Sequence, residues 1–352
     1  MEKEFSVNTQ APAPPDTDDD IVLDIRDLVV HYVLESETVE AVNGVNLRLK
    51  KGQTLGLVGE TGAGKTSTAL SVLNLIQVPP GVIKSGTITV CGHEVLKMTH
   101  KQLEKIRGKS VSMIFQDPMT ALNPVMTVGE QIVESIMYHE GLSQKKSIDK
   151  ALEMLELVGI PGVRGADYPH QFSGGMKQRV IIAIALACSP QVLLADEPTS
   201  ALDVTIQAQV LDMMNDLKKK FGMALIMITH DLGVVAKVCD SVAVMYAGKI
   251  IEAGTLEDVF DDPRHPYTEG LFNSLPNILD RKSELIPIPG RMPDPTKLPV
   301  GCAFEPRCRY AIEKCKEPCT TRFASDTHSF MCSRYDDPGF HLGMNPGGHN
   351  DG

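Results

Sequence analysis

A glycine-rich segment of this 352-residue chain has residue types suited to binding phosphate. Residues 59–66 fit the pattern G-x-x-x-x-G-K-[ST], follow a predicted strand at 54–58 and precede a predicted helix at 67–77. Glycines let successive backbone N–H groups point at phosphate oxygens, and the helix N-terminus adds a partial positive charge. Lys65 is expected to reach the β- and γ-phosphates, and Thr66 to bind Mg²⁺. The predicted ATP-binding residues here are Gly59, Glu60, Thr61, Gly62, Ala63, Gly64, Lys65, Thr66 and Ser67.

Polar residues follow three other apolar runs at the points where strands are expected to end. Asp196 and Glu197 follow the run at 192–195, and an acid at such a strand end faces the crevice where ligands bind in open α/β sheets. We expect Asp196 to hold Mg²⁺ and Glu197 to polarise the attacking water. Gln116 follows residues 111–115, and His230 follows residues 225–229; a purely structural role is the alternative for both. The predicted catalytic residues are Glu197, His230 and Gln116, and the predicted Mg²⁺ ligands are Thr66, Gln116 and Asp196.

The elements that must position these residues alternate between short apolar strands and amphipathic helices. This alternation predicts an α/β core with a parallel sheet. Helix-forming residues between about 119 and 171 are interpreted as an insertion into that core. The expected divisions are a disordered leader at 1–20, a core at 21–272, a Pro- and Cys-rich extension at 273–337 and a flexible tail at 338–352.

Five cysteines are concentrated in the extension, at positions 302, 308, 315, 319 and 332. The N-terminus has no apolar export signal, so reduced thiols or metal ligands are expected rather than disulfides. Their spacing lacks the paired C-x-x-C motifs that are typical of structural zinc. A [4Fe–4S] cluster, a Cys₄ zinc site and unligated thiols all remain open on the residues alone.

Composition excludes two classes of protein. Lys and Arg total 34 against 45 Asp and Glu, which gives a net charge of −11 and argues against a nucleic-acid partner. The longest apolar stretch, 180–188, is much shorter than the roughly 20 residues needed to cross a bilayer.

Several segments together resemble the motifs of ABC-transporter ATPases, in that family's order. Residues 172–179 (FSGGMKQR) resemble its signature segment, although the commonest form, LSGGQ, has Leu and Gln where this chain has Phe172 and Met176. Residues 115–118 resemble the Q-loop, 199–203 the D-loop and 229–231 the switch-histidine loop. The resemblance implies a P-loop core with an antiparallel β subdomain and a helical insertion. It also implies that Tyr32 stacks on adenine, that Asp203 lies in the D-loop, and that the opposite subunit's ATP is contacted by Ser173, Gly174, Gly175 and Met176.

Residues 172–180, 244–254, 263–268 and 288–308 resemble, more narrowly, the dipeptide/oligopeptide/nickel branch of ABC importers, and within it the D-type ATPase subunit. That resemblance implies an ATPase at the cytoplasmic face of the inner membrane, peripherally bound, that powers peptide import. The implied partners are a second, related ATPase, two membrane permeases and an extracytoplasmic peptide-binding protein. It further implies a [4Fe–4S] cluster on Cys302, Cys308, Cys315 and Cys332.

The sequence leaves three alternative functions open. The first is a nickel importer of the same branch. The second is a soluble ABC ATPase that is not coupled to transport. The single ABC core of this chain and its net charge of −11 argue against that alternative. The third is a regulatory module in which ATP only switches conformation; the presence of Glu197 and His230 argues against it.

Overall fold

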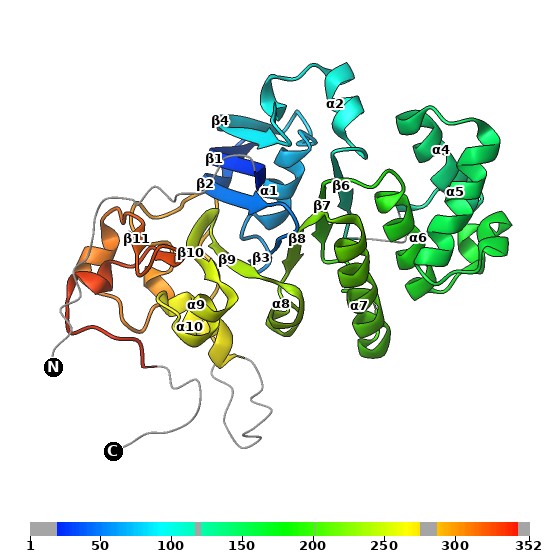
Figure 1. The fold of residues 1–352 in the computed structure, drawn as a ribbon. Coiled ribbons are helices and arrows are strands. Elements are labelled where there is room, and N and C mark those ends of the chain that lie inside the picture. Colours follow the sequence, from blue (N-terminus) through cyan, green and yellow to red (C-terminus); the bar gives the residue numbers. More distant parts are fainter. Residues whose placement is uncertain (1–19, 117–120, 201, 275–286, 344–352) are drawn as a thin grey trace.

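The computed structural model describes residues 20–116, 121–200, 202–274 and 287–343. It has an eight-stranded mixed sheet and a four-stranded antiparallel sheet, with helices packed around them (Figure 1). The expected α/β class with a parallel sheet is therefore confirmed. Nearly all of the expected leader and most of the expected tail lie outside the described residues, and the domain boundaries stay predictions.

Five parallel strands form the centre of the larger sheet, in the order β9-β3-β8-β7-β6. Side chains alternate between its two faces: Leu193 joins the hydrophobic cluster on the helical side, and Leu194 joins the cluster under the antiparallel sheet. Burial on both faces explains why these strands are nearly continuous apolar runs. Their bounds are β3 Thr54–Val58, β6 Val111–Ile114, β7 Val192–Asp196, β8 Ala224–Thr229 and β9 Ser241–Tyr246.

The smaller sheet has the order β2-β1-β4-β5. Two apolar stretches, residues 21–25 and 28–33, belong to one strand, β1 (Ile21–Val33), in which the register shifts near Asp27, a residue with a φ of 48°. Such a bulge interrupts the alternation of apolar residues and makes one strand resemble two. The other strands are β2 Thr38–Lys50, β4 Gly81–Val90 and β5 His93–Glu94.

The helices cover the large sheet and form a separate layer at its β6 edge (Figure 1). In this layer α4 (Val128–Glu140) and α5 (Gln144–Leu157) pack on each other and on α6 (Gly174–Leu186). Ile132, Ile136 and Leu155 are fully buried between them. The remaining helices are α1 Lys65–Val72, α2 His100–Ile106, α7 Val204–Phe221, α8 Leu232–Val238, α9 Leu256–Asp261 and α10 Pro266–Asn273.

The C-terminal segment (residues 287–343) continues the large sheet at its other edge. It begins with a proline-rich connector (residues 287–299). The short strand β12 (Ser329–Phe330) pairs antiparallel with β10 (Lys249–Thr255), and β11 (Arg322–Phe323) pairs antiparallel with β12. Short 3₁₀ turns, rather than long helices, form much of the rest of this segment: Glu305–Arg307, Glu313–Lys316 and Ser333–Asp336.

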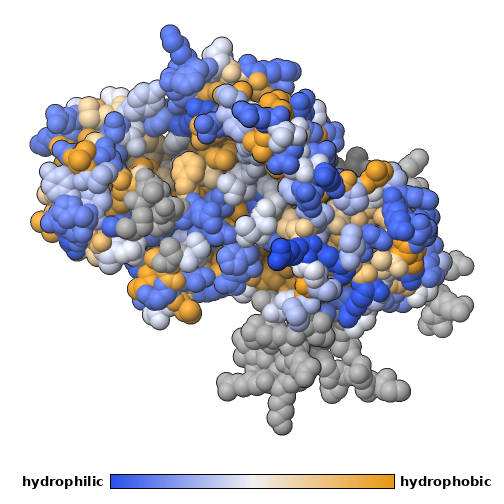
Figure 2. Space-filling model, turned by 180° about the vertical axis from the view of Figure 1, so that it is seen from behind, coloured by the Kyte–Doolittle hydropathy of each residue, from blue (hydrophilic) through white to orange (hydrophobic). Residues whose placement is uncertain are grey.

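Hydrophilic and hydrophobic residues alternate over the surface seen from behind (Figure 2). Among the described residues, fifteen large hydrophobic side chains are exposed, and seven of them belong to residues 121–171, the part of the chain that includes α4 and α5. Within the described ranges, none of the helices combines the length and apolar character that crossing a membrane would require.

Candidate functional site

The predicted catalytic side chains meet at one edge of the parallel sheet. The phosphate-binding loop follows β3, His230 follows β8, Glu197 follows β7 and Gln116 comes shortly after β6, and these four strands are consecutive neighbours. Because the strands are parallel, their carboxyl ends lie side by side and bring the four segments together. The sequence identified each segment, whereas the order of the strands is what makes them one site.

Glu197 is the centre of this group. Gln116 Nε2 donates to Glu197 Oε2 at 2.9 Å, and His230 Nδ1 lies 3.0 Å from Glu197 Oε1. The Glu197 side chain is 14% exposed and that of His230 is 63% exposed, so the carboxylate is largely covered by protein while the imidazole is open to solvent. The backbone of Glu197 has a φ of 45°, an unusual conformation for a side-chain-bearing residue, and its N–H donates to the carbonyl of Ile228. The neighbouring strand thus holds the carboxylate in a defined direction.

The phosphate-binding loop is stabilised from inside by Lys65, which is buried. Its Nζ donates to the carbonyl oxygens of Gly59 at 2.7 Å and Glu60 at 3.0 Å. Gly64 has a φ of 105°, and a Cβ at this position would lie 2.3 Å from the carbonyl oxygen of Ala41. A side chain is therefore excluded at Gly64 by both conformation and space.

Burial changes the ionisation of two groups in this loop region. Desolvation lowers the pKa of Lys65, while the nearby carboxylates of Glu197 and Asp196 act in the opposite direction. Desolvation raises the pKa of Asp196, and a 2.8 Å hydrogen bond from the Thr66 hydroxyl opposes that rise. Both groups would gain from a ligand of opposite charge, a polyphosphate for Lys65 and a cation for Asp196.

Tyr32, the predicted adenine contact, lies close to the loop. Its hydroxyl is 3.1 Å from Ser67 Oγ, at the start of α1. Tyr32 pairs with Val39 in β2, so the antiparallel sheet positions the ring beside the phosphate-binding loop. Its contact with adenine stays a prediction.

The signature residues lie on another element. Ser173 caps α6, and its Oγ accepts a hydrogen bond from Met176 N at 3.4 Å, while Gly174 and Gly175 form the first turn of that helix. Asp203 similarly caps α7 and accepts from Ile206 N at 3.0 Å. The N-terminus of α6 can thus present N–H groups to an anion, and its action on a second subunit's ATP stays a prediction. Asp117 and Pro118 of the Q-loop and Ala201 of the D-loop lie outside the described residues.

Two residues in contact with the loop were missed by the sequence interpretation. The Glu60 N–H donates to the hydroxyl of Tyr267 at 2.9 Å, and Arg307 Nη1 donates to Glu60 Oε2 at 3.1 Å. Arg307 is 247 positions from Glu60 and belongs to no phosphate-binding pattern, so no local signal indicates the contact.

The prediction of a [4Fe–4S] cluster is wrong on this structure, as is the general prediction of metal binding by the cysteines. Cys302, Cys308, Cys315 and Cys332 do line one small pocket. Across residues 20–116, 121–200, 202–274 and 287–343, however, no group of three or more His, Cys, Asp or Glu side chains could hold a metal ion. The spacing brought the thiols into one region without arranging them as ligands.

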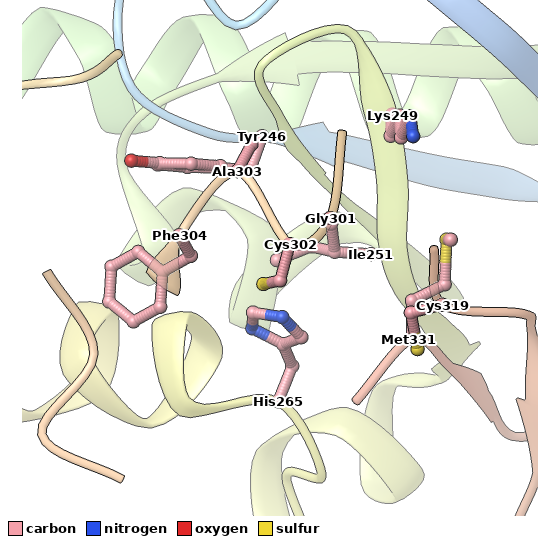
Figure 3. A pocket seen from close by; sticks show the side chains of 10 residues that line it. All are labelled: Tyr246, Lys249, Ile251, His265, Gly301, Cys302, Ala303, Phe304, Cys319 and Met331. Atoms are coloured by element: carbon pink, nitrogen blue, oxygen red, sulfur yellow. The ribbon is translucent and has the colours of Figure 1, made fainter. Parts of the chain in front are cut away.

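The thiols are instead surrounded by protein atoms. Burial raises the pKa of Cys302 and Cys308 to about 11 and that of Cys332 to about 12, which disfavours the thiolate that a metal requires. Cys319 lies with Cys302, His265 and Met331 around a neighbouring pocket (Figure 3). The cysteine-rich region thus contributes packing in this structure.

Two family models match this chain. The model described as "ABC transporter" matches residues 42–200, and the model described as "Oligopeptide/dipeptide transporter, C-terminal region" matches residues 251–315. The first match contains the phosphate-binding loop, the signature residues and the two strand-end acids. The second contains most of β10, all of α9 and α10, and the beginning of the cysteine-rich region.

Curated relatives match over most of their length. The oligopeptide transport ATP-binding protein OppD of Bacillus subtilis is 50% identical over 87% of this chain and 87% of its own. OppD of Salmonella typhimurium is 47% identical over 87% and 90%, and the dipeptide transport ATP-binding protein DppD of Bacillus subtilis is 47% identical over 88% and 94%.

Among solved structures, a dimeric, post-hydrolysis state of the ATP-binding cassette MJ0796 bound to ADP and Pi has a TM-score of 0.60 at 26% identity. The match covers 66% of this chain and 98% of that one. The structure of cbiO1 from Clostridium perfringens matches with a TM-score of 0.59 at 26% identity, over 69% and 91% of the two chains. The cassette fold is therefore shared, and about a third of this chain lies outside it.

Proposed function

Because this chain belongs to the ABC transporter family, as a peptide-transporter-type ATPase subunit, we propose that it powers the import of oligopeptides or dipeptides. The observation that carries the proposal is the joint match of the two regions, since both the ATPase core and the C-terminal region are similar to peptide-transport proteins. Relatives named for oligopeptide and for dipeptide transport are almost equally similar, so we propose peptides as a class.

The residues at the strand ends support a mechanism for hydrolysis. Glu197 accepts hydrogen bonds in this structure and would orient and polarise the attacking water. His230 would hold that carboxylate in place and reach the γ-phosphate, while Gln116 would connect the carboxylate to the neighbouring helical layer. Lys65 would neutralise the charge that develops on the β- and γ-phosphates.

The donors at the loop fit Mg²⁺, the ion expected with ATP in this family. Thr66 and Asp196 offer a hydroxyl and a carboxylate oxygen 2.8 Å apart, and hard oxygen donors are what Mg²⁺ prefers. Gln116 would contribute its amide oxygen as a third ligand. Bound there, the ion would neutralise phosphate charge.

We propose that the site is completed by a second, related ATPase subunit. Ser173, Gly174, Gly175 and Met176 begin α6, a helix that packs on α4, α5 and β6, whereas the phosphate-binding loop precedes α1, which packs on β4, β2 and β7. A head-to-tail partner would bring a signature segment to each ATP, with Asp203 at the shared interface. A dimeric arrangement in the structure of a similar cassette supports this.

The helical layer offers a surface for permeases. Seven of the fifteen exposed large hydrophobic side chains in the described residues belong to residues 121–171, a concentration that supports an interaction surface there. In Figure 2, where this layer lies at the left, hydrophobic residues appear among hydrophilic ones. We propose docking of two permeases and a peripheral position at the cytoplasmic face of the membrane, with an extracytoplasmic peptide-binding protein delivering substrate. The exposed residues are Val125, Met137, Tyr138, Ile148, Leu152, Val163 and Tyr168.

The test is reconstitution of the complete importer in liposomes with its peptide-binding protein. We expect ATP hydrolysis by the assembly to rise when a mixture of oligopeptides or dipeptides is added, and labelled peptide to accumulate. Stimulation by nickel but not by peptides would assign the chain to nickel import. Hydrolysis that neither solute stimulates, in an assembly with all subunits present, would contradict the transport role.

A further inference from the structure

The C-terminal segment contacts the ATP site directly. In the proline-rich connector, the carbonyl oxygen of Pro295 accepts from Glu40 N in β2, and Met292 packs against both hydrophobic clusters of the core. The connector therefore runs along the antiparallel sheet that carries Tyr32. A segment that the ATPase chemistry does not require is thus attached beside the nucleotide-binding residues.

Arg307 is the part of this segment that reaches the phosphate-binding loop. Its side chain is only 7% exposed, and Nη1 donates to Glu60 Oε2 at 3.1 Å and to the Tyr246 hydroxyl at 3.2 Å. Its Nε donates to the carbonyl oxygen of Pro289 at 2.8 Å. The guanidinium carbon lies 5.8 Å from the ring centre of Phe304. Connector, loop and β9 therefore converge on one buried cation.

Aromatic side chains fix the position of that cation. Tyr246, Tyr267 and Phe304 pack with ring-centre distances of 4.6 to 5.4 Å, and all three are buried. Tyr246 and Phe304 also line the pocket shown in Figure 3, next to Cys302. This packing makes the placement of Arg307 a property of the folded C-terminal segment rather than of the loop itself.

Glu60 receives this contact at the second position of the phosphate-binding loop. Its N–H donates to Tyr267, its carbonyl oxygen accepts from Lys65 Nζ, and its carboxylate accepts from Arg307. The backbone of Glu60 is therefore held on both sides while the charge of its carboxylate is balanced. Without the guanidinium, that carboxylate would lie unbalanced beside the site for a polyphosphate, where like charges repel.

We propose that Arg307 is a positioning residue for ATP, through which the C-terminal segment orients Glu60 and neutralises its charge. Arg307 acts through Glu60 and takes no part in the hydrolytic step. Nucleotide affinity consequently depends on the C-terminal segment being docked.

The test compares full-length variants in ATP binding and hydrolysis. For Arg307→Gln we expect the Kd and KM for ATP to rise about threefold to tenfold, the range of one ordinary net hydrogen bond, because Arg307 acts on ATP only through Glu60, with kcat changed by less than about twofold. Arg291→Gln, which changes an exposed arginine in the connector of the same C-terminal segment, is the matched control and should leave both values unchanged.

A double variant separates charge neutralisation from a general loss of structure. If Arg307 acts through the Glu60 charge, Arg307→Gln combined with Glu60→Gln should bind ATP better than Arg307→Gln alone. Additive losses in the two single variants, or an unchanged Kd in Arg307→Gln, would overturn the proposal. Should Arg307→Gln fail to fold, Arg307→Lys keeps the charge without the fork and should raise the Kd by a smaller factor, and by less still when combined with Glu60→Gln. An equal rise in the Kd with and without the Glu60 carboxylate would overturn the proposal.

Discussion

The ATP site and the C-terminal segment show two ways in which one chain positions polar side chains. At the ATP site each chemical group follows its own strand, so the parallel sheet alone brings Glu197, His230 and Gln116 together. In the C-terminal segment short turns and aromatic packing hold the polar groups, and contacts with distant residues decide where each one lies. The functional groups can therefore be predicted from local sequence patterns at the ATP site, where the strands are regular. In the irregular C-terminal segment they cannot.

The largest effect is expected for a variant at the ATP site. Glu197→Gln keeps the shape of the side chain but removes the carboxylate that would polarise water, and kcat should fall about 10³-fold while ATP remains bound. Phosphate release and retained nucleotide are the measurements, with the exposed Glu153→Gln as the control. Hydrolysis at an undiminished rate would remove Glu197 from its role.

The next variant changes Glu252 of β10, which contacts the C-terminal segment through His328, and we expect loss of stability rather than of catalysis. Glu252 is buried and accepts from Arg264 N, from His265 N and from the buried His328, whose Nε2 lies 2.8 Å from the carboxylate. Glu252→Ala leaves these donors without an acceptor and should lower the free energy of unfolding by about 3 kcal/mol. Urea unfolding measures this loss.

The same variant tests whether the contact between β10 and the C-terminal segment affects hydrolysis. At saturating ATP, kcat of Glu252→Ala should stay within about twofold of that of the unchanged chain, because Glu252 is not among the groups that we assign to hydrolysis. Glu252→Gln, which keeps one acceptor oxygen, should lose less stability. A large fall in kcat at full folding would show that the two regions are not separable in this way.

A third variant tests how much His230 contributes to the rate of hydrolysis. His230→Ala removes the group 3.0 Å from the Glu197 carboxylate, and we expect kcat to fall about 10²-fold with little change in the affinity for ATP. Parallel kcat and Kd measurements separate the two effects. A change confined to the Kd would instead make His230 a binding residue.

The smallest expected effect is the pH dependence contributed by His265. Burial lowers the pKa of His265 to about 3 from 6.5, and its Nδ1 accepts from Tyr267 N at 3.0 Å, which requires the unprotonated ring. Because the folded pKa lies below the unfolded value, this contribution is full above pH 6.5 and is lost as the pH falls towards 3. From pH 8 to pH 5.5 it should lower the unfolding free energy by about 1.4 kcal/mol.

His265→Asn isolates that contribution, since Asn can still cap α10 but does not titrate. Urea unfolding of both chains at pH 8 and pH 5.5 should show the smaller pH dependence in the variant. Equal dependence in the two chains would mean that other groups account for it.

Much of the ATP site could be predicted because its signals are local. The loop at 59–66 and the acids at 196 and 197 are contiguous patterns next to apolar runs, and the strands at those runs are where the structure has them. Less regular elements were harder to predict. Strand β4 has a mixed burial pattern with no clear alternation, and α1 ends at Val72, shortly before Asn74, which has a φ of 50°, rather than continuing to 77.

The cysteines show where residue type and spacing are insufficient. Thiol ligation requires sulfur atoms at ligand distances in a defined geometry, and intervals along a chain of turns do not determine that geometry. The expectation of a cluster failed for this reason, although the same residues do line one pocket. Arg307, which belongs to no phosphate-binding motif, is the residue of this segment that contacts Glu60 in the phosphate-binding loop.

The groups for phosphate binding and catalysis are evident in the sequence, because the phosphate-binding loop and the strand-end acids need particular residues next to each other along the chain. Which of these groups meet depends on the tertiary structure. Strand β3 pairs with β8 and β9, strands formed by residues far along the chain, and Arg307 reaches Glu60 across 247 positions. Such contacts form where burial and strand pairing are satisfied over the whole molecule, and no window of sequence contains that information.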